Sequence, residues 1–406
     1  MMRENSVVKN LWMAVILSLM LAFSASVSWA EVGVTDDEIR IGCTADLSGP
    51  IAFMGKQVTE GAQIYFDYIN DRGGVFGRKL KLLVEDDGYQ SPRAVMGCKK
   101  LVTKDKVFCM FMVLGSAQSN AIYPFLESRG IPLICPASQN RALVIPPRKG
   151  LFLADTTYTE QGKIAIEYTV ESLGVKQPKV ACIYQDDTPG HDWLRGIKIG
   201  CKHYGFDVLG LSYKRGSVDF SAQVAKCKHA GITHVYLWTL VREPAMIMKE
   251  AQRVQYKATY ITALPSMQNI VLKLAGDAVD YTNGFYGTGL VYSPVAFESP
   301  DSALHLYAKN NAKYGPNDLD SSNYAYGYTN AVNLVEGLFR AGPDLTREGL
   351  IKALETFDTY YNGLGVPITW GPDRRDGGRG TCIGKAENGE WVQIEDQFIY
   401  STIEEH

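Results

Sequence analysis

The sequence lacks the features that mark most other classes of protein. Beyond the first 30 residues it has no long hydrophobic run, and its formal net charge is only −3. Nothing in it therefore favours a membrane span or a nucleic-acid partner. It has no GxSxG, HExxH, P-loop or GxGxxG motif and only six histidines. These motifs mark hydrolases, metalloproteases and nucleotide-binding enzymes. We predict that the protein is not an enzyme and has no cofactor and no metal site.

The eight cysteines form no CxxC pair and no histidine–cysteine cluster, so a zinc site is not indicated. Most of them lie in apolar segments, as Cys109 does in Val107–Phe111. Buried free thiols therefore explain them as well as disulfides do. The single bridge that we would predict is a local one between Cys98 and Cys109.

The first 30 residues have the three parts of an export signal. Basic residues precede an apolar run from Leu11 to Phe23, and small residues flank Trp29 just before Glu31. Signal peptidases recognise this pattern, and the run is shorter than the roughly 20 residues that span a bilayer. We predict a signal peptide over residues 1–30, cleaved after Ala30, and a mature periplasmic protein. An uncleaved anchor is the alternative.

From Glu38 onward, apolar strands alternate with amphipathic helices, which is typical of parallel sheets with helices on both faces. One helical stripe is Ala62, Tyr65, Phe66 and Ile69, ended by Gly73-Gly74; another is Ala331, Leu334, Val335 and Leu338. We predict strands at Ile39–Cys43, Lys79–Val84, Val107–Leu114, Ile131–Cys135, Lys179–Tyr184, Phe206–Ser212, His234–Trp238 and Thr259–Ala263. These are too many for one comfortable sheet, so we predict two α/β lobes. We expect the chain to pass from the first lobe to the second for the first time near Asp155–Thr157.

Ligands of doubly wound sheets bind beyond the carboxyl ends of the strands. Three loops at these strand ends are candidates for ligand binding: Leu47–Gly55, Leu114–Ser119 and Pro136–Asn140. Ser116 stands where a helix begins, so free N–H groups, the positive helix end and a hydroxyl could bind an anion together. It is equally reasonable that Ser116 only caps its helix.

Two acidic pairs, Asp86-Asp87 and Asp186-Asp187, also end predicted strands. Adjacent residues of a strand point to opposite faces, so one pair alone makes a poor metal site. We interpret both pairs as turn residues. His191, alone in a predicted loop without a nucleophile nearby, is expected to be a surface residue.

A set of characteristic segments occurs in order along nearly the whole mature chain. They are Ile39–Gly55, Gly61 through Asp71–Leu80, Glu85–Asp87, Lys106–Ser116, Gly130–Ser138, Asp219–Ser221 and Tyr324–Tyr326. Together they resemble the type I periplasmic solute-binding proteins of the branched-chain amino acid (leucine/isoleucine/valine) family, which are the receptors of ABC transporters.

The resemblance implies an α/β fold of two doubly wound parallel-sheet lobes, joined by a three-strand hinge, that close on a ligand. We place lobe 1 at residues 31–156 plus 288–360 and lobe 2 at residues 157–287 plus 361–406. In the family, the positions of Ser116 and Ala137–Gln139 hold the ligand carboxylate, and that of Met54 covers the ligand. The expected ligand-binding residues are Phe53, Met54, Gly115, Ser116, Ala137, Ser138, Gln139, Tyr158, Asp187, Pro189, Leu264, Tyr324 and Tyr326. The two late tyrosines could instead be ordinary core residues.

The sequence departs from the family where the ligand's ammonium would bind. Amino-acid-binding members have an acidic residue in the segment that matches Ala263–Ser266, and this chain has no Asp or Glu between Tyr256 and Ile270. A desolvated ammonium without a partner costs several kcal/mol. We therefore expect a small carboxylate-bearing ligand, an aromatic or other organic acid rather than an amino acid, unless Asp187 or Glu243 supplies the charge.

The resemblance favours a monomeric receptor that delivers its ligand to the membrane permease of an ABC importer. The alternative is a sensor for a small amide or acid that signals to a membrane partner. Neighbouring permease and ATPase genes would favour the first function, and a neighbouring kinase or chemoreceptor gene would favour the second.

Overall fold

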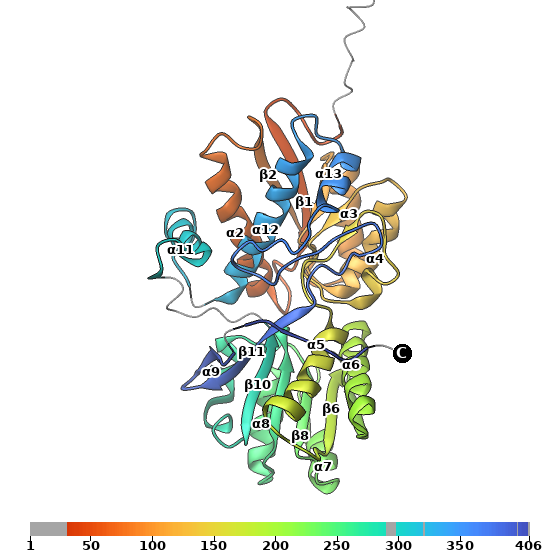
Figure 1. Ribbon diagram of the computed structural model, residues 1–406, viewed down its shortest axis with the longest axis vertical. Coiled ribbons are helices and arrows are strands. Elements are labelled where there is room, and N and C mark those ends of the chain that lie inside the picture. Colours follow the sequence, from red (N-terminus) through yellow and green to blue (C-terminus); the bar gives the residue numbers. More distant parts are fainter. Residues whose placement is uncertain (1–30, 290–297, 320, 396, 405–406) are drawn as a thin grey trace, which may run out of the picture.

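The computed structural model describes residues 31–289, 298–319, 321–395 and 397–404. Within these ranges the chain forms two lobes, each built on a β-sheet with helices packed against it, stacked along the long axis of the molecule (Figure 1). The predicted signal peptide lies outside the described residues. No helix among the described residues is long and apolar enough to cross a membrane.

The first lobe contains a parallel five-stranded sheet with the order β2-β1-β3-β4-β5. Its strands are β1 (Glu38–Ala45), β2 (Lys79–Asp86), β3 (Cys109–Phe111), β4 (Leu133–Ile134) and β5 (Leu151–Phe152). The predicted strands around β3 and β4 are present but shorter than expected. Met112 and Cys135 have φ values of 50° and 47°, and this left-handed backbone turns each chain out of the extended conformation.

Six helices among the described residues belong to the first lobe: α2 (Ala52–Asn70), α3 (Ser91–Thr103), α4 (Ser116–Glu127), α11 (Ala303–Tyr314), α12 (Ser322–Ala341) and α13 (Arg347–Leu354). Both predicted stripes are confirmed on α2 and α12, with Tyr65 only partly buried. After α2 the chain turns through Gly73 and Gly74, which have φ values of 96° and 72°, as the sequence predicts.

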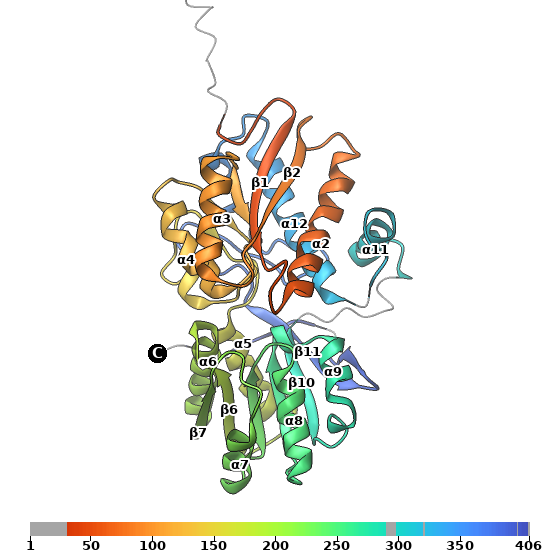
Figure 2. The same ribbon diagram turned by 180° about the vertical axis from the view of Figure 1, so that it is seen from behind.

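Helices α2 and α12 pack closely against each other (Figure 2). A Cβ atom on Gly61 of α2 would lie 2.1 Å from the Tyr324 backbone oxygen, and one on Gly327 of α12 would lie 2.0 Å from the Val58 oxygen. Glycine is therefore required at both positions. This contact ties the late part of the chain to the first lobe.

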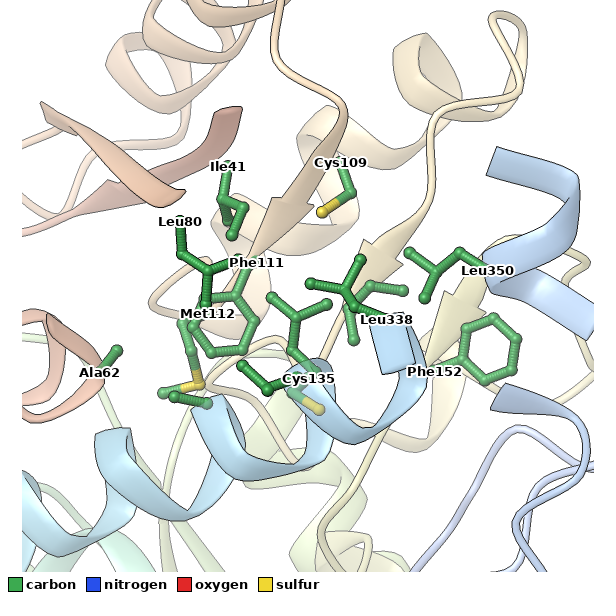
Figure 3. Packing of buried hydrophobic residues seen from close by; sticks show 14 of the residues in the cluster. Ile41, Ala62, Leu80, Cys109, Phe111, Met112, Cys135, Phe152, Leu338 and Leu350 are labelled. Atoms are coloured by element: carbon green, nitrogen blue, oxygen red, sulfur yellow. The ribbon is translucent and has the colours of Figure 1, made fainter. Parts of the chain in front are cut away.

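The two faces of the first sheet have separate hydrophobic cores. Figure 3 shows part of one core, where Cys109 and Phe111 of β3 approach Leu338 of α12 and Leu350 of α13. Cys98 belongs to the other core, between the sheet and helices α3 and α4. The predicted Cys98–Cys109 bridge is therefore wrong, because the sheet separates the two sulfurs. All eight cysteines are buried thiols outside any disulfide of the described residues.

In the part of the chain that the structure describes, the second lobe contains eight strands, ordered β12-β11-β10-β9-β8-β6-β7 with β13 paired to β11. They are β6 (Val180–Gln185), β7 (Val208–Tyr213), β8 (His234–Trp238), β9 (Thr259–Ala263), β10 (Gly284–Gly289), β11 (Gly380–Glu387), β12 (Glu390–Gln393) and β13 (Ile399–Tyr400). The strands predicted from the sequence are the parallel ones from β6 to β9. The pairings of β11 with β10, β12 and β13 are antiparallel.

The helices of the second lobe are α5 (Tyr158–Glu167), continued by a π-helix (Tyr168–Ser172), then α6 (Thr188–Tyr204), α7 (Ser221–His229), α8 (Glu243–Arg253) and α9 (Asn269–Ala275). Short 3₁₀ helices occur at Arg141–Leu143, Leu264–Ser266 and Gly276–Ala278. Asp187 is the N-cap of α6 and its side chain accepts a hydrogen bond from Gly190 N, while Gly205 caps the other end in a left-handed conformation.

The chain passes between the lobes after β5, between β10 and α11, and before β11. The first and third passages run side by side: Gly378 N donates to Ala154 O over 2.9 Å, and Thr156 Oγ1 donates to Gly380 O. The predicted lobe boundaries stay a prediction. Ile368 and Trp370, assigned to lobe 2 from the sequence, pack in the first-lobe core, where Trp370 Nε1 donates to Leu153 O.

Candidate functional site

A cavity of about 90 Å³ lies where the two lobes meet. One buried water occupies roughly 10–15 Å³, so the cavity has room for a small organic molecule. It is lined by Ile51, Met54, Val58, Tyr89, Leu114, Gly115, Ser116, Ala137, Gln139, Tyr158, Pro189, Trp238, Leu240, Leu264, Pro265, Gln268, Ser322, Asn323 and Tyr326. Most of these residues follow the carboxyl ends of strands, where doubly wound sheets bind ligands.

On the first lobe, the start of α4 forms one polar end of the cavity. Its N-cap residue, Gly115, has a φ of 106° and no side chain to cap the first N–H groups of the helix. Ser116 Oγ lies 2.7 Å from Ser138 Oγ, which also accepts a hydrogen bond from Asn140 N over 3.2 Å. Unpaired N–H groups, the positive end of the helix and a hydroxyl together favour a bound anion.

A second polar group on the first lobe consists of Gln139, Asp155 and Tyr326. Gln139 Nε2 donates to Asp155 Oδ2 over 3.2 Å and to Tyr326 Oη over 3.1 Å, and Tyr326 Oη donates to the same carboxylate. Burial raises the pKa of Asp155, although both hydrogen bonds act in the opposite direction. Burial and the Asp155 charge raise the pKa of Tyr326 well above its usual value. Tyr326 therefore stays a neutral donor to Asp155.

The second lobe contributes a mainly apolar wall. Trp238 ends β8, and its ring packs edge-on against Tyr158, with centroids 5.6 Å apart. Leu264 and Pro265 follow the end of β9, and Pro189 lies in the first turn of α6. This wall can cover the apolar part of a ligand, and none of its described lining residues carries a charge.

No charged side chain lines the cavity among the described residues. The two acidic residues that might have supplied a charge have other partners. Asp187 caps α6 and accepts from Gln185 Nε2 and from Arg215 Nη2, the latter over 3.2 Å. Glu243 Oε2 accepts from Leu240 N over 3.2 Å. Neither carboxylate is part of the cavity surface.

Several contacts among the described residues join the two lobes around the cavity, and three of them involve side chains as follows. Arg141 N, on the first lobe, donates to the Asp192 carboxylate of α6. Asn323 Nδ2 of α12 lies 3.5 Å from Gln268 Oε1. The third contact is a cation–π pair, in which the Arg215 guanidinium carbon stands 4.6 Å from the centroid of the Tyr89 ring. Each of these contacts joins one lobe to the other.

Nine of the thirteen residues predicted from the sequence line the cavity: Met54, Gly115, Ser116, Ala137, Gln139, Tyr158, Pro189, Leu264 and Tyr326. Ser138 lies just behind them and reaches the cavity only through Ser116. Phe53 is exposed, Asp187 caps α6, and Tyr324 packs with α2 and α11 in a separate cluster. The structure does not place these three in the cavity wall.

Several lining residues were not predicted, above all Tyr89, Trp238, Gln268 and Asn323. Tyr89 and Trp238 could have been found, because they follow or end strands whose carboxyl ends face the cleft. Gln268 and Asn323 lie at helix starts without a distinctive pattern. Among the described residues, no group of three or more His, Cys, Asp or Glu side chains could hold a metal ion.

A two-lobed α/β protein with a cavity between its lobes is the architecture of a solute-binding protein. A family model described as "Periplasmic binding protein" matches residues 38–390. The Leu/Ile/Val-binding protein homolog 1 of Brucella suis is 25% identical over 361 residues, which cover 88% of this chain and 91% of the relative. The chain therefore belongs to the periplasmic binding protein family, and its predicted resemblance to the branched-chain amino acid receptors is confirmed.

Solved structures agree with this assignment. A fatty acid ABC transporter substrate-binding protein from Thermomonospora curvata is 27% identical with a TM-score of 0.80, over 92% of this chain and 95% of that one. A branched chain amino acid ABC transporter protein from Thermus thermophilus with bound valine is 22% identical, also with a TM-score of 0.80, over 91% and 98% of the two chains. The predicted fold class is confirmed: the chain is a type I periplasmic binding protein of the kind that serves ABC transporters.

Proposed function

We propose that this protein is the periplasmic receptor of an ABC importer for a small organic acid that lacks the α-ammonium of an amino acid. The observation that carries the proposal is the composition of the cavity wall, which has donors for an anion at one end and no charged side chain among the described lining residues. An ammonium ion enclosed there would lose its hydration without gaining an ionic partner.

The carboxylate of the ligand is proposed to bind at the start of α4. Ser138 Oγ already accepts from Asn140 N, so it can donate its own hydrogen to Ser116 Oγ. Ser116 then has its hydrogen free for the ligand, next to the uncapped N–H groups of the helix. Charge-assisted hydrogen bonds of this kind are stronger than neutral ones.

The rest of the ligand is proposed to be apolar and preferably aromatic. Tyr89, Tyr158, Trp238 and Tyr326 surround the cavity, together with aliphatic side chains from both lobes. Flat rings of this kind offer a large contact area with specific stacking geometry. The fatty acid receptor, at 27% identity, supports an acid without an ammonium as the ligand class.

Closure is the step that follows capture. The ligand binds the first lobe through Ser116, and the second lobe then covers it with Pro189, Trp238 and Leu264. Ligand can favour the closed state only by as much as it binds that state more tightly. The membrane permease is proposed to recognise the closed form of the receptor. The mature receptor is proposed to be a monomer that starts at Glu31.

Calorimetric titration with matched ligands tests the proposal. 3-Phenylpropionate and L-phenylalanine differ only in the α-ammonium, and 4-methylpentanoate and L-leucine form the aliphatic equivalent. We expect each acid to bind at least tenfold more tightly than its amino acid. 3-Phenylpropionamide, which lacks the negative charge, should bind weakly. Tight binding of leucine or phenylalanine, with no binding of the acids, would refute the proposal.

A further inference from the structure

We infer that Gln139 is a specificity-determining residue whose side-chain oxygen accepts a hydrogen bond from the ligand, so that the receptor prefers 2-hydroxy acids to unsubstituted acids. The inference rests on the proposed function, since it adds a hydroxyl beside the carboxylate already placed at α4.

Two partners fix which edge of the Gln139 amide faces the protein. Its Nε2 atom lies 3.2 Å from Asp155 Oδ2 and 3.1 Å from Tyr326 Oη. Tyr326 gives its only hydrogen to the Asp155 carboxylate, so its oxygen can only accept from Gln139. Both partners are therefore acceptors toward Gln139, and the amide must present its NH₂ group to them.

This arrangement uses both hydrogens of the amide and leaves the oxygen free. Among the described residues, no donor lies within hydrogen-bonding distance of Gln139 Oε1. The polar atoms that are fully enclosed and lack a partner do not include this oxygen, so it is not sealed inside the protein. Gln139 as a whole is 96% buried yet lines the cavity. The free oxygen is therefore an acceptor that a ligand can reach.

The position of this acceptor relative to the carboxylate site indicates which ligand atom it contacts. Gln139 directly follows Ser138, whose hydroxyl lies 2.7 Å from Ser116 Oγ. Gln139 and Ser116 line the same cavity, so a ligand donor that meets Gln139 is proposed to lie close to the carboxylate, as the hydroxyl on carbon 2 of a 2-hydroxy acid does. An unsubstituted acid would leave the oxygen without a hydrogen bond, which costs affinity in a desolvated site.

A neutral hydroxyl fits this acceptor better than an ammonium does. Asp155 already accepts from Gln139 and Tyr326, so a ligand ammonium could meet its charge only through an intervening amide. A hydroxyl requires no counter-ion. The same geometry thus accounts for a ligand that has a donor beside its carboxylate but no positive charge.

The test is a titration of the intact receptor with 3-phenylpropionate, L- and D-3-phenyllactate, and L-phenylalanine. We expect one phenyllactate enantiomer to bind about three- to tenfold more tightly than phenylpropionate, as one neutral hydrogen bond would give. If neither enantiomer binds more tightly than phenylpropionate, the inference is wrong while the proposed function stands. If no acid binds, the proposed function itself fails. Phenylalanine binding most tightly would overturn both, and would identify Asp155 as an indirect ammonium partner.

Variants separate the role of Gln139 from a general effect on the cavity. Gln139→Met has a similar length and no amide oxygen, so the preference for the hydroxyl should disappear. Gln268→Met makes the same chemical change on the opposite wall. It should leave the ratio of the phenyllactate affinity to the phenylpropionate affinity unchanged, even if both affinities change. A preference that survives in Gln139→Met would refute the inference. If that variant does not fold, the comparison of the acids on the wild-type protein still decides.

Discussion

The roles assigned to the two hydroxyls at the start of α4 predict unequal effects of removing them. Ser116→Ala deletes the hydroxyl proposed to donate to the ligand carboxylate. It also leaves the Ser138 hydroxyl, 2.7 Å away, without its acceptor. A hydrogen bond to a charged group contributes about 1.5–3 kcal/mol, so we expect the Kd for 3-phenylpropionate to rise roughly 10- to 150-fold.

Ser138→Ala is the matched control, because it removes the other hydroxyl of the same pair. Ser116 then keeps its hydrogen for the ligand and loses only the neighbour that orients it. Asn140 N also loses its acceptor, at 3.2 Å. A neutral hydrogen bond contributes about 0.5–1.5 kcal/mol, so affinity should fall no more than about tenfold.

Isothermal titration at constant salt measures both effects, and urea unfolding of the free proteins shows whether either variant is less stable. The order of the two effects matters more than their size. If Ser138→Ala weakens binding as much as Ser116→Ala does, the hydrogen-bond direction proposed here, from the Ser138 hydroxyl to the Ser116 hydroxyl, is wrong. If Ser116→Ala binds the acid as the wild type does, the carboxylate does not bind at the start of α4.

Four further predictions concern stability, closure and the thiols. Burial and the neighbouring carboxylates raise the pKa of Asp87 to about 6, above the roughly 3.9 expected of an unfolded chain. The folded state therefore binds the extra proton, and its stability falls as pH rises from about 4 to 6. Asp87→Asn should remove that slope and add about 1–3 kcal/mol to the free energy of unfolding at pH 7.5, measured by urea titration; an unchanged slope would contradict this. Arg215→Gln should raise the ligand Kd about two- to fivefold through loss of the cation–π contact with Tyr89, and an unchanged Kd would mean that this contact does not favour closure. Gly61→Ala places a Cβ 2.1 Å from the Tyr324 backbone oxygen, so it should cost about 1–3 kcal/mol; an unaltered melting temperature would show that α2 and α12 can separate freely. All eight cysteines should react with a thiol reagent in urea without reductant and none should react rapidly in the folded protein; fewer than eight in urea would reveal a disulfide.

The parallel part of the fold could be predicted because its pattern is local. The predicted strands at His234–Trp238 and Thr259–Ala263 coincide with β8 and β9, since each is a short apolar run that is buried on both faces. The antiparallel strands β11 and β12 were not predicted. They contain glycines and charged residues and lack a continuous apolar run, and they are held as strands by pairing with β10, with each other and with β13.

The first-lobe half of the site could be predicted for the same reason. A strand followed by a glycine and a serine at a helix start is a local pattern, and it located Gly115 and Ser116 in the cavity wall. Asp187 had an equally suggestive position at the end of a strand. Its carboxylate is nevertheless used by Gly190 N, Gln185 and Arg215. Whether a polar side chain serves a ligand or the protein depends on these partners, which the sequence does not reveal.

Gln139 shows most clearly why ligand specificity could not be derived from a local motif. The sequence placed this residue in the site, but its amide could face the ligand with either edge. The choice is made by Asp155, 16 residues away, and by Tyr326, 187 residues away on α12. Helix α12 can bring Tyr326 to the cavity only because it crosses α2 at the closely packed Gly61 and Gly327. A backbone contact in the first-lobe core thus decides whether the receptor presents a hydrogen-bond donor or an acceptor to its ligand.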